Sequence, residues 1–335
     1  MKLTLIVPGL LARSATAIAA APAFARFARH ATGPEIDPRG AAHATLAALG
    51  AADGAPVAAL AALGAGVDSG DDYVLFAEPV TLVAGRNDVV LAGRVADLAA
   101  EDTVALLAAL NAHFVADGLS FFAPRPDAWF VRMGALPDLA TTPLDLVLGE
   151  PIYSHLPSGA DARTWQRWQS EAQMLLFAHP VNAERERRGL PPVSGLWLWG
   201  GGRRTDLVVA AAPVAFAAAG AAGDLVRGFA RQLGQTDDRL PDAFGAMLAQ
   251  WTTAADRVAV MAALDDDAAL AGFAQRWLVP AVAALESGPL TSLDLLGSGD
   301  GRAARWGAQR PTRLARFTGA WRSARFVLPE RVDDP

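Results

Sequence analysis

The chain has 335 residues, of which 52% are hydrophobic, enough apolar material for one large domain or two. Its net charge is −6, and this excess of acidic residues argues against nucleic acid as a partner. The absence of cysteine excludes disulfides, thiolate nucleophiles and Cys-ligated zinc, and we expect a cytoplasmic protein.

The first predicted element is a buried strand over residues 3–7, a short apolar run that Pro8 and Gly9 end. The same run, extended to residue 11 and followed by Ala-Phe-Ala at residues 23–25, also imitates a secretory signal peptide. The first strand is the preferred interpretation because Pro8-Gly9 interrupts the apolar run. Residues 12–63 are rich in alanine at helical spacing and predict helices separated by glycine breaks.

From residue 68 the alanine-rich helical pattern gives way to short strand-like runs, which predicts an inserted subdomain of strands and one helix over residues 68–135. The helix is predicted over residues 99–114, with Val104, Leu107, Leu110 and Phe114 on its buried face. Short runs of β-branched and aromatic residues predict strands at residues 73–76, 80–83, 89–91, 119–122 and 129–133.

Ser158 and Asp161 have the spacing of a capping box and predict the start of another helix. This helix ends near His179 because Pro180 cannot continue it. Its predicted apolar stripe consists of Trp165, Trp168, Ala172 and Leu175.

The segment HPVNAERERRGLPPVSGLWLWGGG, residues 179–202, is the most specific part of the sequence. It predicts a short helix capped by Asn182 and closed by Gly189, then a Pro-Pro loop. A buried strand at residues 196–199 and a sharp glycine turn at residues 200–202 complete it.

Beyond residue 202 the pattern alternates between strands and helices, which predicts an α/β protein with a mostly parallel sheet flanked by helices. The apolar stretch 207–223 is mostly alanine and glycine and too weak for a membrane span, so no membrane partner is expected. The predicted elements are strands at residues 207–211 and 258–263 and helices at residues 221–233 and 270–285.

Residues 179–202 resemble the "HPVN…R…G…PAN…WGxG" segment of the archaeal-type, cofactor-independent phosphoglycerate mutases of the alkaline-phosphatase superfamily. Residues 70–98, 138–152 and 213–234 resemble other parts of the same family more loosely, and Leu144 stands where a histidine is usual. The resemblance implies an alkaline-phosphatase-like α/β core made of residues 1–67 and 136–335, with residues 68–135 as an inserted α+β subdomain.

That resemblance also implies two divalent ions and a serine or threonine nucleophile. Pro8, however, stands where the family has an aspartate, and no histidine follows His179. Ser69, beside Asp68, is the best-placed nucleophile candidate by composition, and an ordinary turn is the alternative.

The remaining candidates for a cation site are Asp265, Asp266 and Asp267, which follow a predicted strand, and Asp300. Oxygen ligands alone would suit magnesium or calcium. The alternative is an acidic helix start, favoured by the helix dipole. We expect no cofactor, and magnesium or manganese only if the protein is an enzyme with a rearranged site.

An anion or phosphoester pocket is a further possibility, because arginines and bare glycine amides occur together in residues 179–203. A purely structural role for the same residues is the alternative, and His179 can simply hydrogen-bond at the helix end. The candidates are His179, Asn182, Arg185, Arg188, Gly200, Gly201, Gly202 and Arg203.

The function that these observations favour is that of a non-catalytic relative of the mutases with a regulatory or ligand-binding role. The opening LIVPGLL and the HPVN to WGGG segment resemble the proteobacterial regulatory proteins of the RpfE type. The expected partner is a phosphorylated small molecule or a protein, and the arginine-rich run 302–331 with Trp306 and Trp321 is more typical of a solvated face than of a nucleic-acid site. The alternative is a metal-dependent phosphomutase or phosphatase with a rearranged site.

Overall fold

A computed structural model describes residues 1–86, 88–95, 97–210, 215–218, 223–235, 238–250, 256–299, 301–311 and 325–329. The sequence candidates Asp300, Trp321 and Arg331 lie outside these residues, as do Ala211 and Ala221 at the bounds of two predicted elements. The chain divides into two compact units. Unit 1 consists of Met1–Asp53, Val209–Val226 and Gln235–Pro335, and unit 2 of Gly54–Val208 and Arg227–Gly234.

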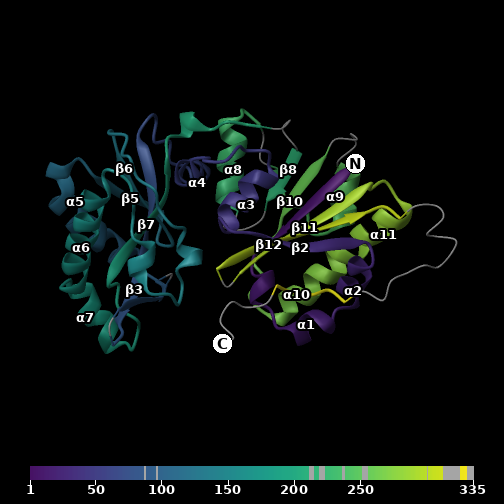
Figure 1. The fold of residues 1–335 in the computed structure, drawn as a ribbon, viewed down its shortest axis with the longest axis horizontal. Helices are drawn as coiled ribbons and strands as arrows, with labels where there is room; N and C mark the ends of the chain where they lie inside the picture. The colour runs from purple at the N-terminus through teal and green to yellow at the C-terminus, as the bar shows by residue number, and fades with distance from the viewer. Residues whose placement is uncertain are drawn as a thin grey trace. The chain divides into compact units, whose positions relative to one another are not determined.

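Unit 1 is built on a mixed sheet in which the first strand of the chain is central (Figure 1). The neighbours β11, β1, β10, β8 and β9 run parallel, whereas β12 is antiparallel to both β11 and β2. In order across the sheet the strands are β2 (Ala31–Asp37), β12 (Arg302–Gln309), β11 (Ser292–Gly299), β1 (Lys2–Val7), β10 (Arg257–Val260), β8 (Ala215–Ala218) and β9 (Asp238–Arg239).

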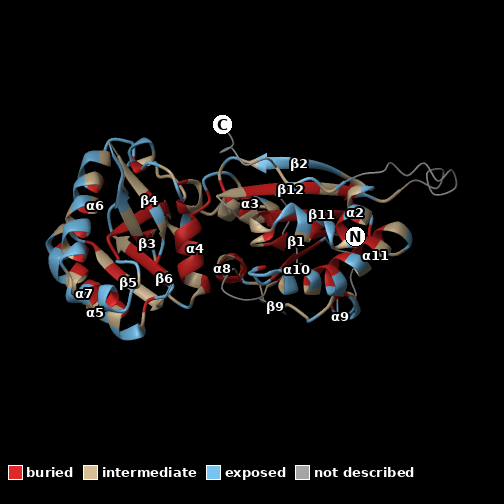
Figure 2. Ribbon diagram, turned by 90° about the horizontal axis from the view of Figure 1, so that it is seen from below, coloured by how far each residue is buried: buried red, intermediate tan, exposed pale blue. Residues whose placement is uncertain are grey.

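One face of this sheet carries the main core of unit 1, where Leu3, Leu5 and Val7 of β1 are fully buried. An unbroken apolar run of this kind is typical of a strand covered on both faces. On the opposite face, α3 (Ala41–Ala48) contacts β11 and β12. The other helices in the described part of the unit are α1 (Ala15–Ala19), α2 (Pro22–Ala28), α9 (Phe244–Gln250), α10 (Asp267–Phe273) and α11 (Val279–Ser287), with a π-helical turn at Ala274–Leu278 (Figure 1). Figure 2 shows the exposed edge strand β2 beside the more buried β12.

The helical stretch Asp267–Ser287 is, among the described residues, the one long and apolar enough to cross a membrane by length and composition. Half of its most apolar part is buried within the protein. Leu270, Trp277 and Leu285 of this stretch pack in the core of unit 1, which accounts for its apolar composition.

Unit 2 contains an antiparallel sheet in which the long strand β3 pairs with β7 along one side and with β6 and β4 along the other. A core of apolar side chains joins this sheet to α5, α6 and α7, and α4 packs against β3 and β7. The strands are β3 (Tyr73–Ala84), β4 (Val89–Arg94), β5 (Ser120–Arg125), β6 (Ala128–Met133) and β7 (Gly195–Gly202). The helices are α4 (Val57–Gly64), α5 (Ala100–Phe114), α6 (Ala162–Phe177) and α7 (Pro180–Arg187), and α8 (Gly223–Gln232) ends within this unit.

The predicted class, a mostly parallel sheet flanked by helices together with an α+β part, is confirmed. The boundaries differ from the prediction of 68–135 for the inserted part, because unit 2 runs from Gly54 to Val208. The reason is that β7 pairs with β3 and α6 packs on β7, which brings residues 136–208 into the same unit.

Several local predictions need correction. In α5 the buried residues are Thr103, Leu106, Leu110 and Phe114, whereas Val104 is exposed, so the buried face is rotated from the predicted one. In α6 Leu176 takes the buried position predicted for Leu175. The capping box also fails to form, since the Asp161 carboxylate accepts a hydrogen bond from the Asp138 backbone instead.

Candidate functional site

The carboxyl ends of the parallel strands in unit 1 form the edge at which open α/β sheets usually bind ligands. After β1 the chain continues through Pro8 and Gly9, and the backbone N–H of Leu264, beyond β10, donates to the Pro8 carbonyl at 2.9 Å. Gly9 has φ +80°, and a Cβ there would lie 2.8 Å from the Leu264 carbonyl oxygen. The loops that follow β1 and β10 are therefore closed against each other at Pro8 and Gly9.

Apolar side chains fill the space around the described ends of β1 and β11. Leu10 and Leu11 begin the short 3-10 helix Leu10–Ala12, and both are buried. A Cβ on Gly297, near the end of β11, would lie 2.8 Å from Cδ2 of Leu10, so the leucine occupies the space above that strand. Leu264 is buried as well. The described ends of β1, β10 and β11 therefore present carbon where a metal site would need carboxylates.

The three consecutive aspartates beyond β10 lie outside this apolar closure and are exposed. Asp266 is the N-cap of α10, where its Oδ1 accepts a hydrogen bond from the Ala269 N–H at 2.7 Å. The Asp265 backbone carbonyl accepts from Arg13 at 2.9 Å, and Asp267 lies in the first turn of the helix. This is the arrangement of an acidic helix start.

No group of three or more His, Asp or Glu side chains that could hold a metal ion occurs among the residues described above. The described residues at the ends of β1, β10 and β11 do not fit the pair of divalent ions that the family resemblance implies, because two closely spaced ions require several carboxylate or imidazole ligands. Asp300, the remaining sequence candidate for a cation ligand, lies outside the described residues.

Ser69 lies in a turn of unit 2 that precedes β3. Its carbonyl accepts from the Asp72 N–H at 3.1 Å, and Asp68 accepts from the Gly70 N–H at 2.9 Å and pairs with Arg204 at 3.0 Å. These contacts are those of an Asx turn. The Ser69 hydroxyl is buried and has no hydrogen-bond partner in the described part of the chain. The turn accounts for the backbone but not for this hydroxyl.

The HPVN segment begins α7, and its N-cap is His179 instead of the predicted Asn182. The His179 ring accepts from the Val181 N–H at 3.3 Å. Asn182 is buried inside the helix, and its amide nitrogen donates to the carbonyls of Leu176 and Val193 at 2.8 and 2.9 Å. Its Oδ1 accepts from the Val193 N–H at 2.8 Å, so this side chain joins α6, α7 and the start of β7.

Arg185 is one of the largest fully buried side chains of the protein. Its Nε donates to the Pro191 carbonyl at 2.8 Å, and a terminal nitrogen pairs with Asp97 at 2.7 Å. Arg188 is an exposed C-cap of α7. Arg203 donates to the Gly134 carbonyl at 3.1 Å. The three guanidinium groups thus have separate surroundings, and their role in binding an anion stays a prediction.

The glycines after Trp199 are the last residues of β7 and not a turn. A Cβ on Gly201 would lie 2.1 Å from the Tyr73 hydroxyl oxygen, and one on Gly202 would lie 2.6 Å from Cβ of Pro56. Gly200 has φ +71°, a conformation that favours glycine. Close packing within unit 2 accounts for all three glycines without a ligand.

Trp199 belongs to a polar cluster that the sequence interpretation missed. Its Nε1 donates to the carboxylate of Glu78, a buried residue of β3, at 2.5 Å, and Arg94 pairs with the same carboxylate at 2.9 Å. Burial raises the pKa of Glu78, and the opposing effects of Arg94 and Trp199 do not cancel that rise. Trp199 also stacks on Phe76 with ring centroids 4.6 Å apart. The pair of Glu78 and Arg94 could have been suspected only from strand pairing.

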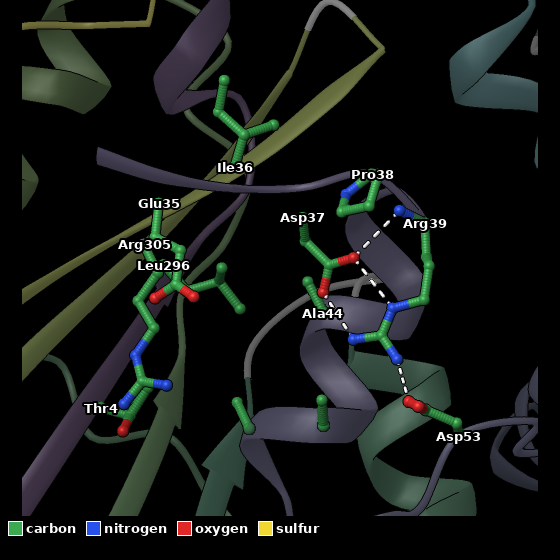
Figure 3. A pocket seen from close by; sticks show the side chains of 12 residues that line it. Thr4, Glu35, Ile36, Asp37, Pro38, Arg39, Ala44, Asp53, Leu296 and Arg305 are labelled. Atoms are coloured by element: carbon green, nitrogen blue, oxygen red, sulfur yellow. Dashed lines mark hydrogen bonds and ion pairs between the residues drawn. The ribbon is translucent and has the colours of Figure 1, made fainter. Parts of the chain in front are cut away.

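A cavity of about 470 Å³ lies in unit 1, on the sheet face that α3 partly covers (Figure 3). Because β2 is antiparallel to β12, which is antiparallel to β11, Asp37 at the end of β2 reaches the same sheet edge as the ends of β1 and β11. The lining residues are Thr4, Glu35, Ile36, Asp37, Pro38, Arg39, Ala44, Ala47, Ala48, Asp53, Leu296 and Arg305.

On one side of the cavity, three charged side chains form a series of connected ion pairs. Arg39 binds both carboxylate oxygens of Asp37 through Nε at 3.0 Å and a terminal nitrogen at 2.8 Å, and its other terminal nitrogen pairs with Asp53 (Figure 3). The hydrogen bonds from Arg39 lower the pKa of Asp37 and outweigh the opposing effect of its burial. Burial lowers the pKa of His43, whose ring contacts the Arg39 carbonyl at 3.0 Å.

On the other side, the guanidinium group of Arg305 lies beside Thr4 (Figure 3). A terminal nitrogen of Arg305 pairs with Asp294, a buried residue of β11, and Lys2 pairs with the same carboxylate at 3.2 Å. Thr4, Glu35 and the pair Asp294 and Arg305 come from three distant parts of the sequence, and the strand register brings them to one face.

Comparison with known proteins adds a family likeness over part of the chain. Residues 57–182 match the family model of 2,3-bisphosphoglycerate-independent phosphoglycerate mutase, which is over a third of the sequence. A mutase of this type from Methanothrix thermoacetophila is 43% identical over 65 residues, which are 19% of this chain and 17% of that protein. The 2,3-bisphosphoglycerate-independent phosphoglycerate mutase 2 of Methanothermobacter thermautotrophicus is 27% identical over 150 residues, or 44% of this chain and 37% of that protein.

Two solved structures are also similar. The cofactor-independent phosphoglycerate mutase of Thermoplasma acidophilum aligns with a TM-score of 0.42 and 19% identity over 93% of this chain and 90% of that one. The PH0037 protein of Pyrococcus horikoshii aligns with a TM-score of 0.47 and 17% identity over 93% and 88%. The chain spans well under half the length of the curated relatives described above, and its sequence is phosphoglycerate-mutase-like over residues 57–182.

Proposed function

We propose that this chain is a non-catalytic relative of the cofactor-independent phosphoglycerate mutases that has a ligand-binding or regulatory role. The observation that carries the proposal is the apolar closure of the strand ends by Pro8, Leu10 and Leu264. Transfer of a phosphoryl group by two metal ions needs carboxylate or imidazole ligands at that edge. The exposed Asp265 to Asp267 run, with Asp266 engaged as a helix cap, supplies no such set.

We propose the regulatory role on the resemblance of the opening LIVPGLL and of the HPVN to WGGG segment to the RpfE-type regulatory proteins. The expected partner is a phosphorylated small molecule or another protein, and the expected compartment is the cytoplasm. Arg185 and Arg203 have protein partners that explain them, so a phosphorylated ligand would have to compete with or extend those contacts.

The decisive experiment is a phosphoglycerate mutase assay on the purified full chain with manganese and with magnesium, next to an active mutase as positive control. We expect no interconversion of 2- and 3-phosphoglycerate above the blank and less than one tightly held divalent ion per chain by elemental analysis. Turnover, or two retained ions per chain, would overturn the proposal. A thermal shift with 3-phosphoglycerate addresses the ligand, because a bound ligand stabilises the folded state by roughly 2.7 kcal/mol at a hundred times its Kd.

The alternative, an enzyme with a rearranged site, is favoured by one observation, the buried Ser69 hydroxyl, which has no hydrogen-bond partner among the described residues. If the mutase assay detects turnover, Ser69→Ala separates the possibilities. A nucleophile role requires that this variant lose the activity while it unfolds at the same temperature as the wild type. Activity that survives in Ser69→Ala would place the chemistry elsewhere.

A further inference from the structure

We propose that the cavity between β2 and α3 binds a small zwitterion that carries one carboxylate and one ammonium group, a molecule of the size and charge pattern of a free amino acid. The proposal gives the ligand-binding role above a site and a ligand class, and it rests on the proposed function to that extent. The site lies in unit 1, whereas the anion candidates from the sequence lie in unit 2.

Some of the charged groups that line the cavity are already fully paired within the protein, and others have hydrogen-bonding atoms left for a ligand. Arg39 is fully engaged, since Asp37 takes its Nε and one terminal nitrogen and Asp53 takes the other. Arg305 commits one terminal nitrogen to Asp294, which leaves N–H groups beside Thr4, and its side chain is 47% exposed. The available groups are therefore part of one guanidinium and the Thr4 hydroxyl.

Glu35 supplies the opposite charge. It lies directly across from Arg305 in the pairing of β2 with β12, so the two side chains stand on the same face of the sheet. The Glu35 carboxylate nevertheless makes no ion pair or hydrogen bond with any described residue. The reason is that Arg305 pairs with Asp294 of β11, on the other side of β12 from Glu35. Within the described part of the chain, the unpaired Glu35 carboxylate and the Arg305 guanidinium, which has N–H groups left over, thus border the same cavity.

The balance of charges that line the cavity favours one class of ligand. Glu35, Asp37 and Asp53 line the cavity against Arg39 and Arg305, so carboxylates outnumber guanidinium groups. A phosphate monoester with two negative charges would meet net repulsion there, and a simple cation would leave the Arg305 N–H groups unmatched. A zwitterion satisfies both groups, with its carboxylate on Arg305 and Thr4 and its ammonium on Glu35.

The size and the remaining wall agree with this class. Small-molecule sites typically occupy about 300 to 1,000 Å³, and this cavity is about 470 Å³. Ala44 and Ala47 of α3 and Leu296 of β11 form an apolar wall. Such a wall favours an amino acid with a short aliphatic side chain, whose burial contributes about 25 cal/mol per Å².

The test is isothermal titration of the full chain with L-alanine, L-valine and L-leucine, each titrated separately, together with 3-phosphoglycerate. Two half-ligands, isovalerate and isobutylamine, lack the ammonium and the carboxylate group of L-valine respectively. We expect at least one amino acid to bind with a Kd below about 1 mM, equivalent to roughly −4 kcal/mol, and both half-ligands to bind at least about tenfold more weakly. Absence of amino-acid binding at ligand concentrations ten times higher would overturn the proposal.

Two variants locate the site. Glu35→Gln removes the carboxylate from an exposed position, and Ala47→Leu fills the cavity from an exposed helix position where leucine is well tolerated. Each should weaken amino-acid binding by at least about tenfold, the loss expected for one charged hydrogen bond or a blocked pocket. Asp242→Asn, which neutralises an exposed carboxylate of the same unit outside the cavity, should leave the Kd unchanged.

Binding that survives both Glu35→Gln and Ala47→Leu would place the ligand elsewhere and overturn the assignment. Binding of 3-phosphoglycerate without any amino acid would also overturn it, while the proposed non-catalytic function would stand. Conversely, mutase turnover would remove the proposed function, yet amino-acid binding sensitive to Glu35→Gln would still support this site. The two failures are therefore distinguishable.

Discussion

Asn182 is a buried amide that makes three hydrogen bonds to backbone groups of two residues, Leu176 at the end of α6 and Val193 before β7. Asn182→Ala should lower the free energy of unfolding by about 2 to 4 kcal/mol, because the buried N–H and carbonyl of Val193 lose their partner and the Leu176 carbonyl keeps the hydrogen bond from the His179 N–H but loses the one from Asn182. Urea denaturation followed by tryptophan fluorescence measures the loss. Glu186→Ala, an exposed change on the same helix, should alter stability by no more than about 0.5 kcal/mol. An equal loss in both variants would contradict this role for Asn182.

Glu286 gives the protein a pH-dependent contact between α2 and α11. Burial raises its pKa, but hydrogen bonds from Arg26 at 3.1 Å and His30 at 3.0 Å outweigh this effect, and the net pKa lies below the ordinary 4.5. A carboxyl whose pKa is lower in the folded state stabilises it above the unfolded pKa and loses that contribution as pH falls through the folded pKa.

Glu286→Gln should therefore destabilise the protein at pH 6, by about 1 kcal/mol at most because the partly exposed pair is screened. The difference from the wild type should shrink as the pH falls below about 4.5, the reference pKa of an unperturbed glutamate. Urea denaturation at several pH values between about 6 and 3 checks both statements. Glu186→Gln should show the same pH dependence as the wild type, and a Glu286→Gln effect that is constant across this range would rule out the assigned contribution.

The strands that could be predicted from the sequence are those with unbroken apolar runs. β1, the apolar part of β7 and β10 lie close to their predicted positions, because burial on both faces requires apolar residues throughout. β2, with the sequence ATGPEID at the sheet edge, and β12, with RAARWGAQ, carry no such run. Their strand conformation comes from pairing with β11 and with each other, which no local pattern records.

The candidate sites show the same division between local and non-local information. Capping residues and the buried strand of the segment 179–202 follow from local patterns, apart from the exchange of His179 for Asn182 as the N-cap. The glycines of β7 are explained by Tyr73 and Pro56, which approach from more than a hundred residues away in the chain. The cavity depends on residues 4, 35 and 305 meeting through strand register, so sequence patterns alone could not reveal it.

The packing of α8 on α4 gives a prediction in which two glycine substitutions have opposite signs. A Cβ on Gly228 would lie 1.7 Å from the Leu60 carbonyl oxygen, so Gly228→Ala must push the two helices apart and should cost about 3 kcal/mol. Gly245 in α9 has open space around its Cβ position, and Gly245→Ala should stabilise the protein by about 0.5 to 1 kcal/mol through helix propensity. Thermal and urea denaturation of both variants measure the difference. A neutral Gly228→Ala would mean that the helices are not in close contact.

The order of strands in the two sheets determines which segments of the chain can fold alone. In unit 1 the strands β1 and β2 are separated in the sheet by β12 and β11, which come from the other end of the sequence. Every neighbour of β1 therefore lies beyond Val208 in the chain. In unit 2, by contrast, β3 to β7 and their core all lie between Gly54 and Val208.

Residues 54–208 expressed alone should therefore fold, with cooperative thermal unfolding and the circular dichroism of a mixed α/β chain, since a unit with its own core can do so. Its stability should be lower than in the full chain, because α4 loses the contact with Gly228 and its neighbours. Residues 1–53 should stay unfolded, because their two strands have no partner to pair with and the core of unit 1 comes largely from residues after Val208. A folded 1–53 segment together with an unfolded 54–208 segment would contradict the division into two units.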